Sequence, residues 1–344
     1  MKVSNKTKHA FVNFKNILLG RHSLLIVMQD NPDPDAIAAA IALRKLADNI
    51  AGIKSSIAHG GMVGRSENRA LVKYLNLNLN DCAYVDFGKF DLIAMVDTQP
   101  GTGNNSLPQD RTVDIVFDHH PIKKTTRSSK FYDVRVHYGA TSTILAEYLT
   151  LAGIEIEMPL ATALLYAIRS DTQDLGREAC NADVGAITQL FPIANKRMLS
   201  RIQRGSVPGE YFVMLANALK NAHVYEDTII TELGDIDNPD MIAEVADLLL
   251  RHDGIEWVMS SGVFNDKLLI SIRANDEKKR ADLAIKKIVS RIGTGGGHLT
   301  YAGAQVPLGD QKSLKNIPKT EKIVRNRFLK IAGHYKSKGR RLID

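Results

Sequence analysis

Residues 23–36 of the chain read SLLIVMQDNPDPDA. The stretch 23–29 is almost continuously apolar, which predicts a short β-strand covered on both faces, as in a parallel sheet. A turn rich in asparagine and proline follows, and the alanine-rich amphipathic segment 35–49 then predicts a helix. Asp33 and Asp35 therefore stand just beyond the carboxyl end of a buried strand. Open α/β sheets bind their ligands at that edge.

Strand-like and helix-like segments alternate over the first half of the chain. We expect further strands at 54–58, 91–96 and 113–117, and further helices at 66–75, at 159–169 and in a segment that ends at 151. This alternation predicts an α/β fold with a doubly wound parallel sheet. Two of these strands run directly into Asp97 and Asp118, so they would bring more acids to the same sheet edge.

The second half of the chain has a different order of elements. We expect strands at 224–233, 257–264 and 267–272, helices at 239–251, 279–291 and 320–334, and a glycine-rich loop at 293–297. This order predicts a second, smaller α/β domain with a mixed sheet. The expected division is a first domain at 1–192, a connection at 193–215, a second domain at 216–335 and a basic, frayed tail at 336–344.

The composition is that of a globular protein. The 344 residues are 44% hydrophobic and 24% charged, enough for about two domains. No apolar run approaches the roughly 20 residues of a membrane-spanning helix, and residues 1–21 lack the apolar core of a secretory signal. Cys82 and Cys180 have neither metal-site nor disulfide spacing, so we expect free thiols. These features predict a cytoplasmic protein without a membrane span.

The formal net charge of +7 is unevenly distributed. From residue 311 onward, eleven Lys and Arg face two acids, which gives +9 and leaves about −2 for residues 1–310. We therefore expect no basic groove in the body of the protein. The segment from Lys312 to Arg341 is expected to be a solvated face, with weak nucleic-acid contact as the alternative.

The acids and histidines suggest a metal centre. Carboxylates supply hard oxygen ligands, and imidazole shifts a mixed site from calcium toward manganese, iron, cobalt or zinc. Asp97, alone at the end of its strand, is suited to bridge two ions, and two-metal sites favour phosphoester hydrolysis. Taken singly, such acids could instead cap the next helix, and the pair His119-His120 could be structural.

Five motifs in order resemble the DHH family of phosphoesterases with a C-terminal DHHA1 domain. They are Asn31-Pro32-Asp33-Pro34-Asp35-Ala36, Val96-Asp97-Thr98, Asp118-His119-His120-Pro121, Asp171-Thr172 and, in the second half, Gly295-Gly296-Gly297-His298 with Ala302-Gly303 behind it. The resemblance covers most of the chain. It implies an active site in the cleft between the two domains.

The resemblance also implies roles for individual residues. Two divalent ions, manganese or else magnesium, would be held by Asp33 and Asp97 at one site and by Asp35, Asp97, His119 and Asp171 at the other. His120 would face the phosphate as hydrogen-bond donor or general acid, and Asp118 would support the histidines. In the DHHA1 domain, the backbone of Gly295, Gly296 and Gly297 would approach a phosphate or base, with His298 and Arg273 binding the nucleotide.

One position departs from the family pattern. Four residues before Asp33 the family has a metal-binding histidine, and this chain has Gln29. The amide oxygen of Gln29 is a neutral, weaker ligand that suits magnesium or manganese better than zinc. We therefore expect a first metal site that is weakened or selects harder ions, yet stays active.

These features predict a manganese-dependent phosphoesterase acting on short nucleotides through a water activated by two metals. The layout resembles the bifunctional oligoribonuclease and pAp phosphatase (nanoRNase) branch, with short RNA or pAp as substrate. Alternatives with the same chemistry are cyclic or linear dinucleotides, and single-stranded DNA as in RecJ-like exonucleases. Non-enzymatic alternatives are a nucleotide sensor with a degraded first site and an adaptor tethered through the basic tail. A homodimer is compatible with the resemblance.

Overall fold

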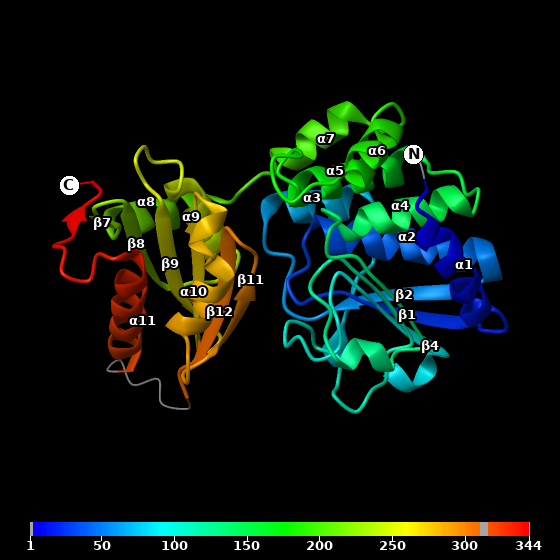
Figure 1. The fold of residues 1–344 in the computed structure, drawn as a ribbon, viewed down its shortest axis with the longest axis horizontal. Coiled ribbons are helices and arrows are strands. Elements are labelled where there is room, and N and C mark those ends of the chain that lie inside the picture. Colours follow the sequence, from blue (N-terminus) through cyan, green and yellow to red (C-terminus); the bar gives the residue numbers. More distant parts are fainter. Residues whose placement is uncertain (1–2, 310–315, 344) are drawn as a thin grey trace. The chain divides into compact units, whose positions relative to one another are not determined.

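The computed structural model describes residues 3–309 and 316–343, which divide into two compact units bounded as Met1–Ser206 and Val207–Asp344. Each unit has its own sheet and core (Figure 1). The segment 193–215, expected as a connection, contains helix α7 (Lys196–Gln203) and the start of α8 (Gly209–Lys220). Lys312 lies outside the described residues.

The first unit is built on a parallel sheet. Its six described strands have the order β3-β2-β1-β4-β5-β6, and every neighbouring pair is parallel. The strands are β1 (Ser23–Val27), β2 (Lys54–His59), β3 (Asn80–Asp81), β4 (Leu92–Val96), β5 (Ile115–Asp118) and β6 (Phe131–Val134). Strand order reverses between β1 and β4, which is where open α/β sheets bind ligands. The predicted α/β class is confirmed.

The two faces of this sheet are covered differently. One face is covered by the helices α1 (Asn5–Leu18), α2 (Pro34–Ala51), α4 (Thr141–Leu151) and α5 (Met158–Asp171) (Figure 1). Alternate strand residues such as Ile26 and Phe117 pack against them. Their neighbours, such as Val27 and Val116, pack against short 3-10 turns that contribute Cys82 and Phe87. Both faces are therefore buried, as the continuously apolar strands predict. Helices α3 (Ser66–Tyr74) and α6 (Asn181–Leu190) complete the unit.

Helix α2 begins and ends where its sequence dictates. Asp33 is its N-cap and accepts a hydrogen bond from the Ala36 amide (2.9 Å), with Pro34 in the first turn. These are preferred residues at a helix start. Gly52, with φ of 65°, ends the helix in the left-handed conformation. None of the helices in the described part of the chain is long and apolar enough to cross a membrane.

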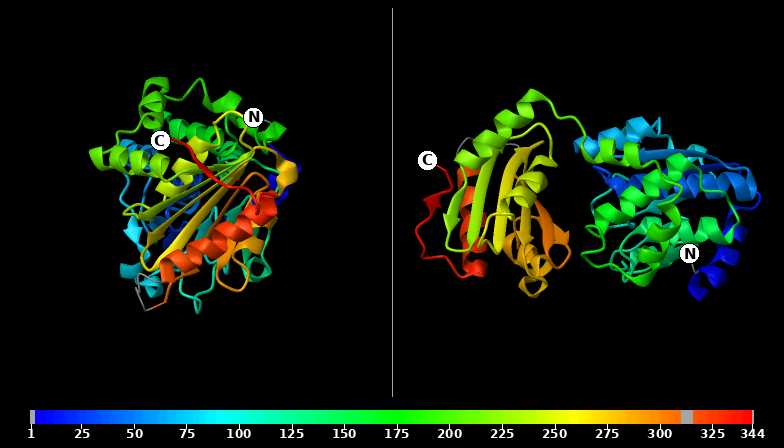
Figure 2. Two further views of the ribbon diagram at one scale, coloured as in Figure 1. Left: turned by 90° about the vertical axis from the view of Figure 1, so that its left-hand side faces the viewer. Right: turned by 90° about the horizontal axis from the view of Figure 1, so that it is seen from above.

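The second unit is a mixed sheet with helices on both faces (Figure 2). Its described strands have the order β11-β12-β10-β9-β8-β7-β13, in which only β8 and β9 pair in parallel. Helices α8 and α9 (Met241–Leu249) cover one face, and α10 (Ala281–Ile288) and α11 (Asn316–Ala332) cover the other. The strands are β7 (His223–Tyr225), β8 (Thr228–Asp235), β9 (Trp257–Phe264), β10 (Lys267–Ala274), β11 (Thr294–Gly297), β12 (Tyr301–Pro307) and β13 (Arg340–Arg341).

Two expectations for the second half were wrong. The glycine run is not a loop, because β11 pairs with β12 as an edge strand. A Cβ on Gly297 would lie 2.4 Å from the Ala302 Cα, so close backbone packing demands glycine there. The tail is not simply frayed either, since Arg340 and Arg341 pair with β7 and the Leu342 amide donates to Ala222.

A buried ion network ties the first unit together. Arg135, whose side chain is 1% exposed, donates to Asp133 (3.0 Å), Glu147 (3.0 Å) and the Tyr138 hydroxyl (3.0 Å). Burial opposes the charge of Arg135, but these partners raise the pKa of its guanidinium far above its usual value. The network joins β6, α4 and the loop that carries Tyr138. It therefore fixes the backbone directly behind the sheet edge.

Replacing Arg135 by methionine should destabilise the first unit by about 3–5 kcal/mol, because Asp133 and Glu147 would remain buried without their partner. Denaturant unfolding of the full chain measures this loss. The control is Lys6→Ala, which removes an exposed partner of the same Asp133 (3.0 Å) and should cost about 1 kcal/mol or less. Equal losses for the two variants would contradict the role of the network.

The second unit contains a carboxyl that should make stability depend on pH. Burial, and then the charge of Glu232, raise the pKa of Glu321 on α11 from 4.5 to about 7. The folded state therefore binds more protons than the unfolded state between these values, so stability falls as pH rises from about 4.5 to about 7. Glu321→Gln should gain stability relative to wild type across this window, and pH-dependent thermal unfolding measures it. A constant difference at all pH values would contradict the assignment.

Candidate metal centre

Acidic residues from separate segments meet at the carboxyl edge of the first sheet. Asp33 and Asp35 follow β1, Asp97 follows β4, Asp118 ends β5, and Asp171 ends α5. Asp97 has a φ of 57°, a conformation uncommon for residues other than glycine and tolerated best by asparagine and aspartate. This turn points the chain away from the strand at the residue that bears the carboxylate.

The histidines after β5 lie among these acids. His119 Nε2 is 3.3 Å from Asp171 Oδ2 and 3.6 Å from Asp97 Oδ1. His120 Nδ1 is 3.7 Å from the same Asp97 oxygen and 2.8 Å from Asp118 Oδ1. Donor atoms of two trios lie within 4.8 Å of one another: Asp97 with His119 and His120, and Asp35 with His119 and Asp171. His119 is common to both trios, and Asp33 belongs to neither.

The start of helix α4 holds Asp35 in place. The amides of Thr141 (2.7 Å) and Ser142 (2.8 Å) donate to the two carboxylate oxygens of Asp35, and the Thr141 hydroxyl donates to Asp97 (3.1 Å). The first amides of a helix have no partner within the helix and carry partial positive charge, so they stabilise a buried carboxylate. Asp35 therefore serves as the partner of α4 while facing the cluster.

Each histidine is oriented through its Nδ1 atom. His119 Nδ1 lies 3.1 Å from the carbonyl oxygen of Tyr138, an acceptor, so Nδ1 carries the proton and Nε2 is directed at the acids. Asp118 orients His120 through Nδ1 and is itself held by the Gln99 amide (2.6 Å). Such outer partners set the tautomer of metal-binding and catalytic histidines.

Burial and the neighbouring charges shift the pKa values of the clustered acids and of His119. Burial, followed by the charges of Asp171 and Asp35, raises the pKa of Asp33 to about 7, and burial with Asp33 and Asp35 raises the pKa of Asp97 well above its ordinary value. Burial would lower the pKa of His119, but Asp171 and the other acids raise it to about 10. The cluster thus draws positive charge to its centre.

The cluster fits divalent cations. Asp97 Oδ2 is buried and has no hydrogen-bond partner among the described residues, although an unpaired buried carboxylate oxygen is costly. The donors are carboxylate oxygens and imidazole nitrogen, the set expected for manganese, iron, cobalt or zinc. A cation placed among them would satisfy Asp97 and offset the repulsion.

Gln29 lies at the edge of this cluster. Its amide nitrogen donates to Asp33 Oδ2 (2.9 Å), and its amide oxygen accepts from Asn104 (3.3 Å). In this arrangement the amide group restrains Asp33 and directs its oxygen toward Asn104. The side chain that replaces the family histidine is therefore engaged with two neighbours.

The predicted substrate-binding residues gather on the second unit. The His298 and Tyr301 rings are stacked at 4.6 Å, and the Arg273 guanidinium lies 5.7 Å from the Tyr301 ring. Arg273 also forms an ion pair with Asp247 and donates to Ser271 (2.7 Å). Gly296 has open space where a Cβ would stand, whereas Gly295 and Gly297 pack tightly on β12.

Each of the two units matches the model of a known protein family. The model of the DHH family, N-terminal domain, matches residues 23–168, and that of the DHHA1 domain matches residues 226–325. The chain carries a DHH domain followed by a DHHA1 domain. The DHH match contains the loops that bear Asp33, Asp97 and the two histidines, and the DHHA1 match contains Arg273 and His298.

Individual relatives extend this comparison. An uncharacterized protein of Methanocaldococcus jannaschii is 35% identical over 318 residues, 90% of this chain and 64% of that protein. A probable manganese-dependent inorganic pyrophosphatase of Bacillus licheniformis is 30% identical over 173 residues, 50% of this chain and 55% of that protein. The chain thus spans less than two thirds of either relative. A crystal structure of an exopolyphosphatase-related protein from Bacteroides fragilis shares the fold, with TM-score 0.74, 15% identity and coverage of 94% of this chain and 98% of that one.

Several residues around the DHH and DHHA1 sites were not identified from sequence. Gln99 donates a hydrogen bond to Asp118, and Asn104 donates one to Gln29. Tyr301 stacks on His298. A polar residue two positions after Asp97 was a signal for Gln99, because it follows the same strand end. No local pattern indicated Asn104 or Tyr301, since each meets its partner only through the fold.

Replacing Gln29 by histidine should strengthen manganese binding at one of the DHH-domain sites, because imidazole is a stronger ligand for transition metals than a neutral amide. Calorimetric titration of metal-free protein with manganese and with magnesium measures the change, with a larger gain expected for manganese. Asn104→Ala is the matched control, since it removes the partner of Gln29 without adding a ligand. Identical titrations for wild type and Gln29→His would show that position 29 does not reach the metal.

Proposed function

We propose that the chain is a manganese-dependent phosphoesterase that hydrolyses short nucleotides. The observation that supports this most directly is Asp97, whose buried Oδ2 has no hydrogen-bond partner among the described residues while its Oδ1 lies 3.6 Å from His119. A buried carboxylate placed among acids and imidazoles is poorly suited to a structural role but well suited to bridge cations.

The proposed ligands are those of the predicted two-ion arrangement. Asp33 and Asp97 would hold one ion, with Gln29 restraining Asp33, and Asp35, Asp97, His119 and Asp171 would hold the other. Bound divalent ions supply a hydroxide-like nucleophile at neutral pH and neutralise charge on the phosphoryl group. The residues of the chain keep this site rigid, since α4 fixes Asp35 and the Tyr138 carbonyl fixes His119.

His120 is the proposed proton donor. Its side chain is 36% exposed, whereas that of His119 is 7% exposed, so His120 is the imidazole that a substrate can reach. Asp118 engages its Nδ1 atom, which leaves Nε2 as the nitrogen that faces the leaving oxygen of a bound phosphoester. Asp118 stabilises the imidazolium, because burial is outweighed by the His120 hydrogen bond and charge, which lower the pKa of Asp118 to about 2.

The DHHA1 domain favours a nucleotide over pyrophosphate. The pyrophosphatase similarity covers half of this chain, whereas the DHHA1 match adds Arg273 and the stacked rings of His298 and Tyr301. Aromatic rings offer stacking surfaces for bases. The guanidinium of Arg273, held by Asp247 and Ser271, places positive charge beside these rings. We therefore propose short oligoribonucleotides and pAp as substrates, as in the nanoRNase branch.

Asp97→Asn should reduce manganese-dependent hydrolysis by more than ~100-fold, since the loss of even an outer partner of a metal ligand costs about 10–100-fold. Asparagine tolerates the backbone conformation of Asp97 and removes its repulsion, so the metal-free variant should unfold at no lower temperature than wild type. Asp110→Asn, an exposed carboxylate change, is the control. Full activity in Asp97→Asn would refute the bridging role.

A substrate panel separates the proposed enzyme from its alternatives. It contains pAp, di- to pentanucleotides, cyclic dinucleotides, pyrophosphate and long single strands, each with saturating manganese. We expect turnover of pAp and the short oligonucleotides to exceed that of all others. Tight nucleotide binding without any turnover would instead identify a sensor, for which Gln29 in place of histidine is the motivating observation.

A further inference from the structure

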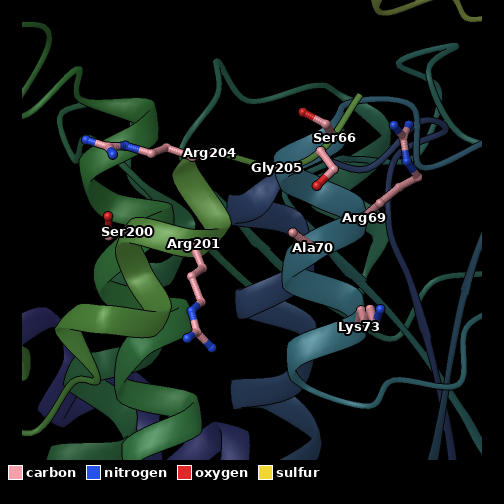
Figure 3. Close-up of a pocket in the computed structure, with 9 residues that line it drawn as sticks. Ser66, Arg69, Ala70, Lys73, Ser200, Arg201, Arg204 and Gly205 are labelled. Atoms are coloured by element: carbon pink, nitrogen blue, oxygen red, sulfur yellow. The ribbon is translucent and has the colours of Figure 1, made fainter. Parts of the chain in front are cut away.

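A strongly basic pocket lies along helices α3 and α7 of the DHH domain (Figure 3), and none of its described lining residues is a predicted site residue. It has a volume of about 580 Å³, within the range of ligand pockets. Its cationic lining residues are Arg69 and Lys73 of α3, Arg201 of α7 and Arg204 just beyond it. The remaining described lining residues are serines, an alanine and a glycine, so no acid offsets the four charges.

The charge of this face is unusual for the chain. The segments 65–73 and 196–206 hold seven Lys or Arg and one acid, Glu67, although residues 1–310 together carry about −2. Within the described part of the chain, no carboxylate pairs with Lys73, Arg201 or Arg204. The expectation that the body has no basic groove was therefore wrong, because α3 and α7 are far apart in sequence and come together only in the fold.

The shape of the pocket suits an extended polyanion better than a single phosphate. Figure 3 shows Ala70 on the side of α3 that faces α7 and Arg201 running along the gap between the helices, whereas Arg69 and Arg204 are directed outward on opposite sides. Arg201 alone lies in the gap, and Arg69, Lys73 and Arg204 are spread outside it, so the cations match successive phosphates of a chain better than one phosphate. Arg69 also donates to the Gly64 carbonyl, which restrains its position.

The geometry of the pocket is fixed by close backbone contact. A Cβ on Gly205 would lie 2.5 Å from the Ser66 carbonyl carbon, so only glycine lets the chain after α7 pass against the start of α3. Asn68, in the first turn of α3, donates to the Pro32 carbonyl (3.2 Å), one residue before Asp33. This hydrogen bond connects the pocket to the loop that carries Asp33. The positions from Arg65 to Lys73 extend about 12 Å along α3.

We propose that this α3–α7 face binds the phosphodiester backbone of a single-stranded nucleic acid beyond the nucleotide being cleaved. The nature of the ligand rests on the proposed function, whereas the anion-binding role rests on the pocket alone. The absence of aromatic rings among its described lining residues makes the contact independent of base sequence. The face thus adds affinity for strands that extend beyond the cleaved nucleotide, while short oligonucleotides remain the preferred substrates.

The test is equilibrium binding of a labelled, unstructured RNA strand of about 15 nucleotides, measured by fluorescence anisotropy in EDTA so that no turnover occurs. Arg201→Gln with Arg204→Gln should weaken binding by about tenfold or more and reduce the slope of log K against log salt by about 1.4, at about 0.7 per lost phosphate contact. Lys8→Gln with Lys15→Gln, exposed residues of α1, is the matched control and should leave the slope unchanged.

Other outcomes are equally decisive. An unchanged slope in the variant with Arg201→Gln and Arg204→Gln, with thermal unfolding as in wild type, would overturn the proposal. Binding of polyphosphate but not of RNA would replace nucleic acid by an inorganic phosphate chain. With manganese present, the variant should lose more turnover on the long strand than on a dinucleotide. RNA binding in wild type without hydrolysis of any substrate would reject the phosphoesterase and retain the binding face.

Discussion

Repulsion among the carboxylates at the carboxyl edge of the first sheet is the constraint on which the site depends. Asp33, Asp35, Asp97 and Asp171 are held together in a largely buried space, and burial with mutual repulsion raises the pKa values of Asp33 and Asp97. The fold supplies positive partners at fixed points, namely the amides at the start of α4 and the His119 ring. These partners leave part of the negative charge uncompensated, and this remaining charge makes the cluster favour cations.

The supporting residues connect this cluster to the core. The carbonyl of Tyr138 orients His119, and the hydroxyl of the same residue joins the buried network of Arg135 and Glu147. Gln99 holds Asp118 in the same way from the loop after β4. Buried polar groups are costly unless all their partners are present, so a satisfied network specifies one arrangement. The rigidity of the site is thus a property of the sheet and of the helices packed on it.

Sequence reasoning succeeded where local pattern and structure coincide. The apolar strands that end on Asp97 and Asp118 and the helix capped by Asp33 are found as expected. It failed where pairing partners are distant. The glycines at 295–297 form an edge strand because β12 lies beside them, and Arg340 and Arg341 pair with β7. Neither segment has the alternating apolar pattern that identifies a strand by itself.

The sequence by itself determined the α/β class, the order of the site motifs and the chemistry of their side chains, since apolar periodicity and residue type are local properties. Only the tertiary structure decided which atoms meet: the α4 amides with Asp35, Asn104 with Gln29, and the cations of α3 with those of α7. These meetings depend on strand order and helix packing, which no short segment encodes. Residues 1–310 together carry a net charge of only about −2, yet the fold gathers four Lys and Arg side chains on the α3–α7 face.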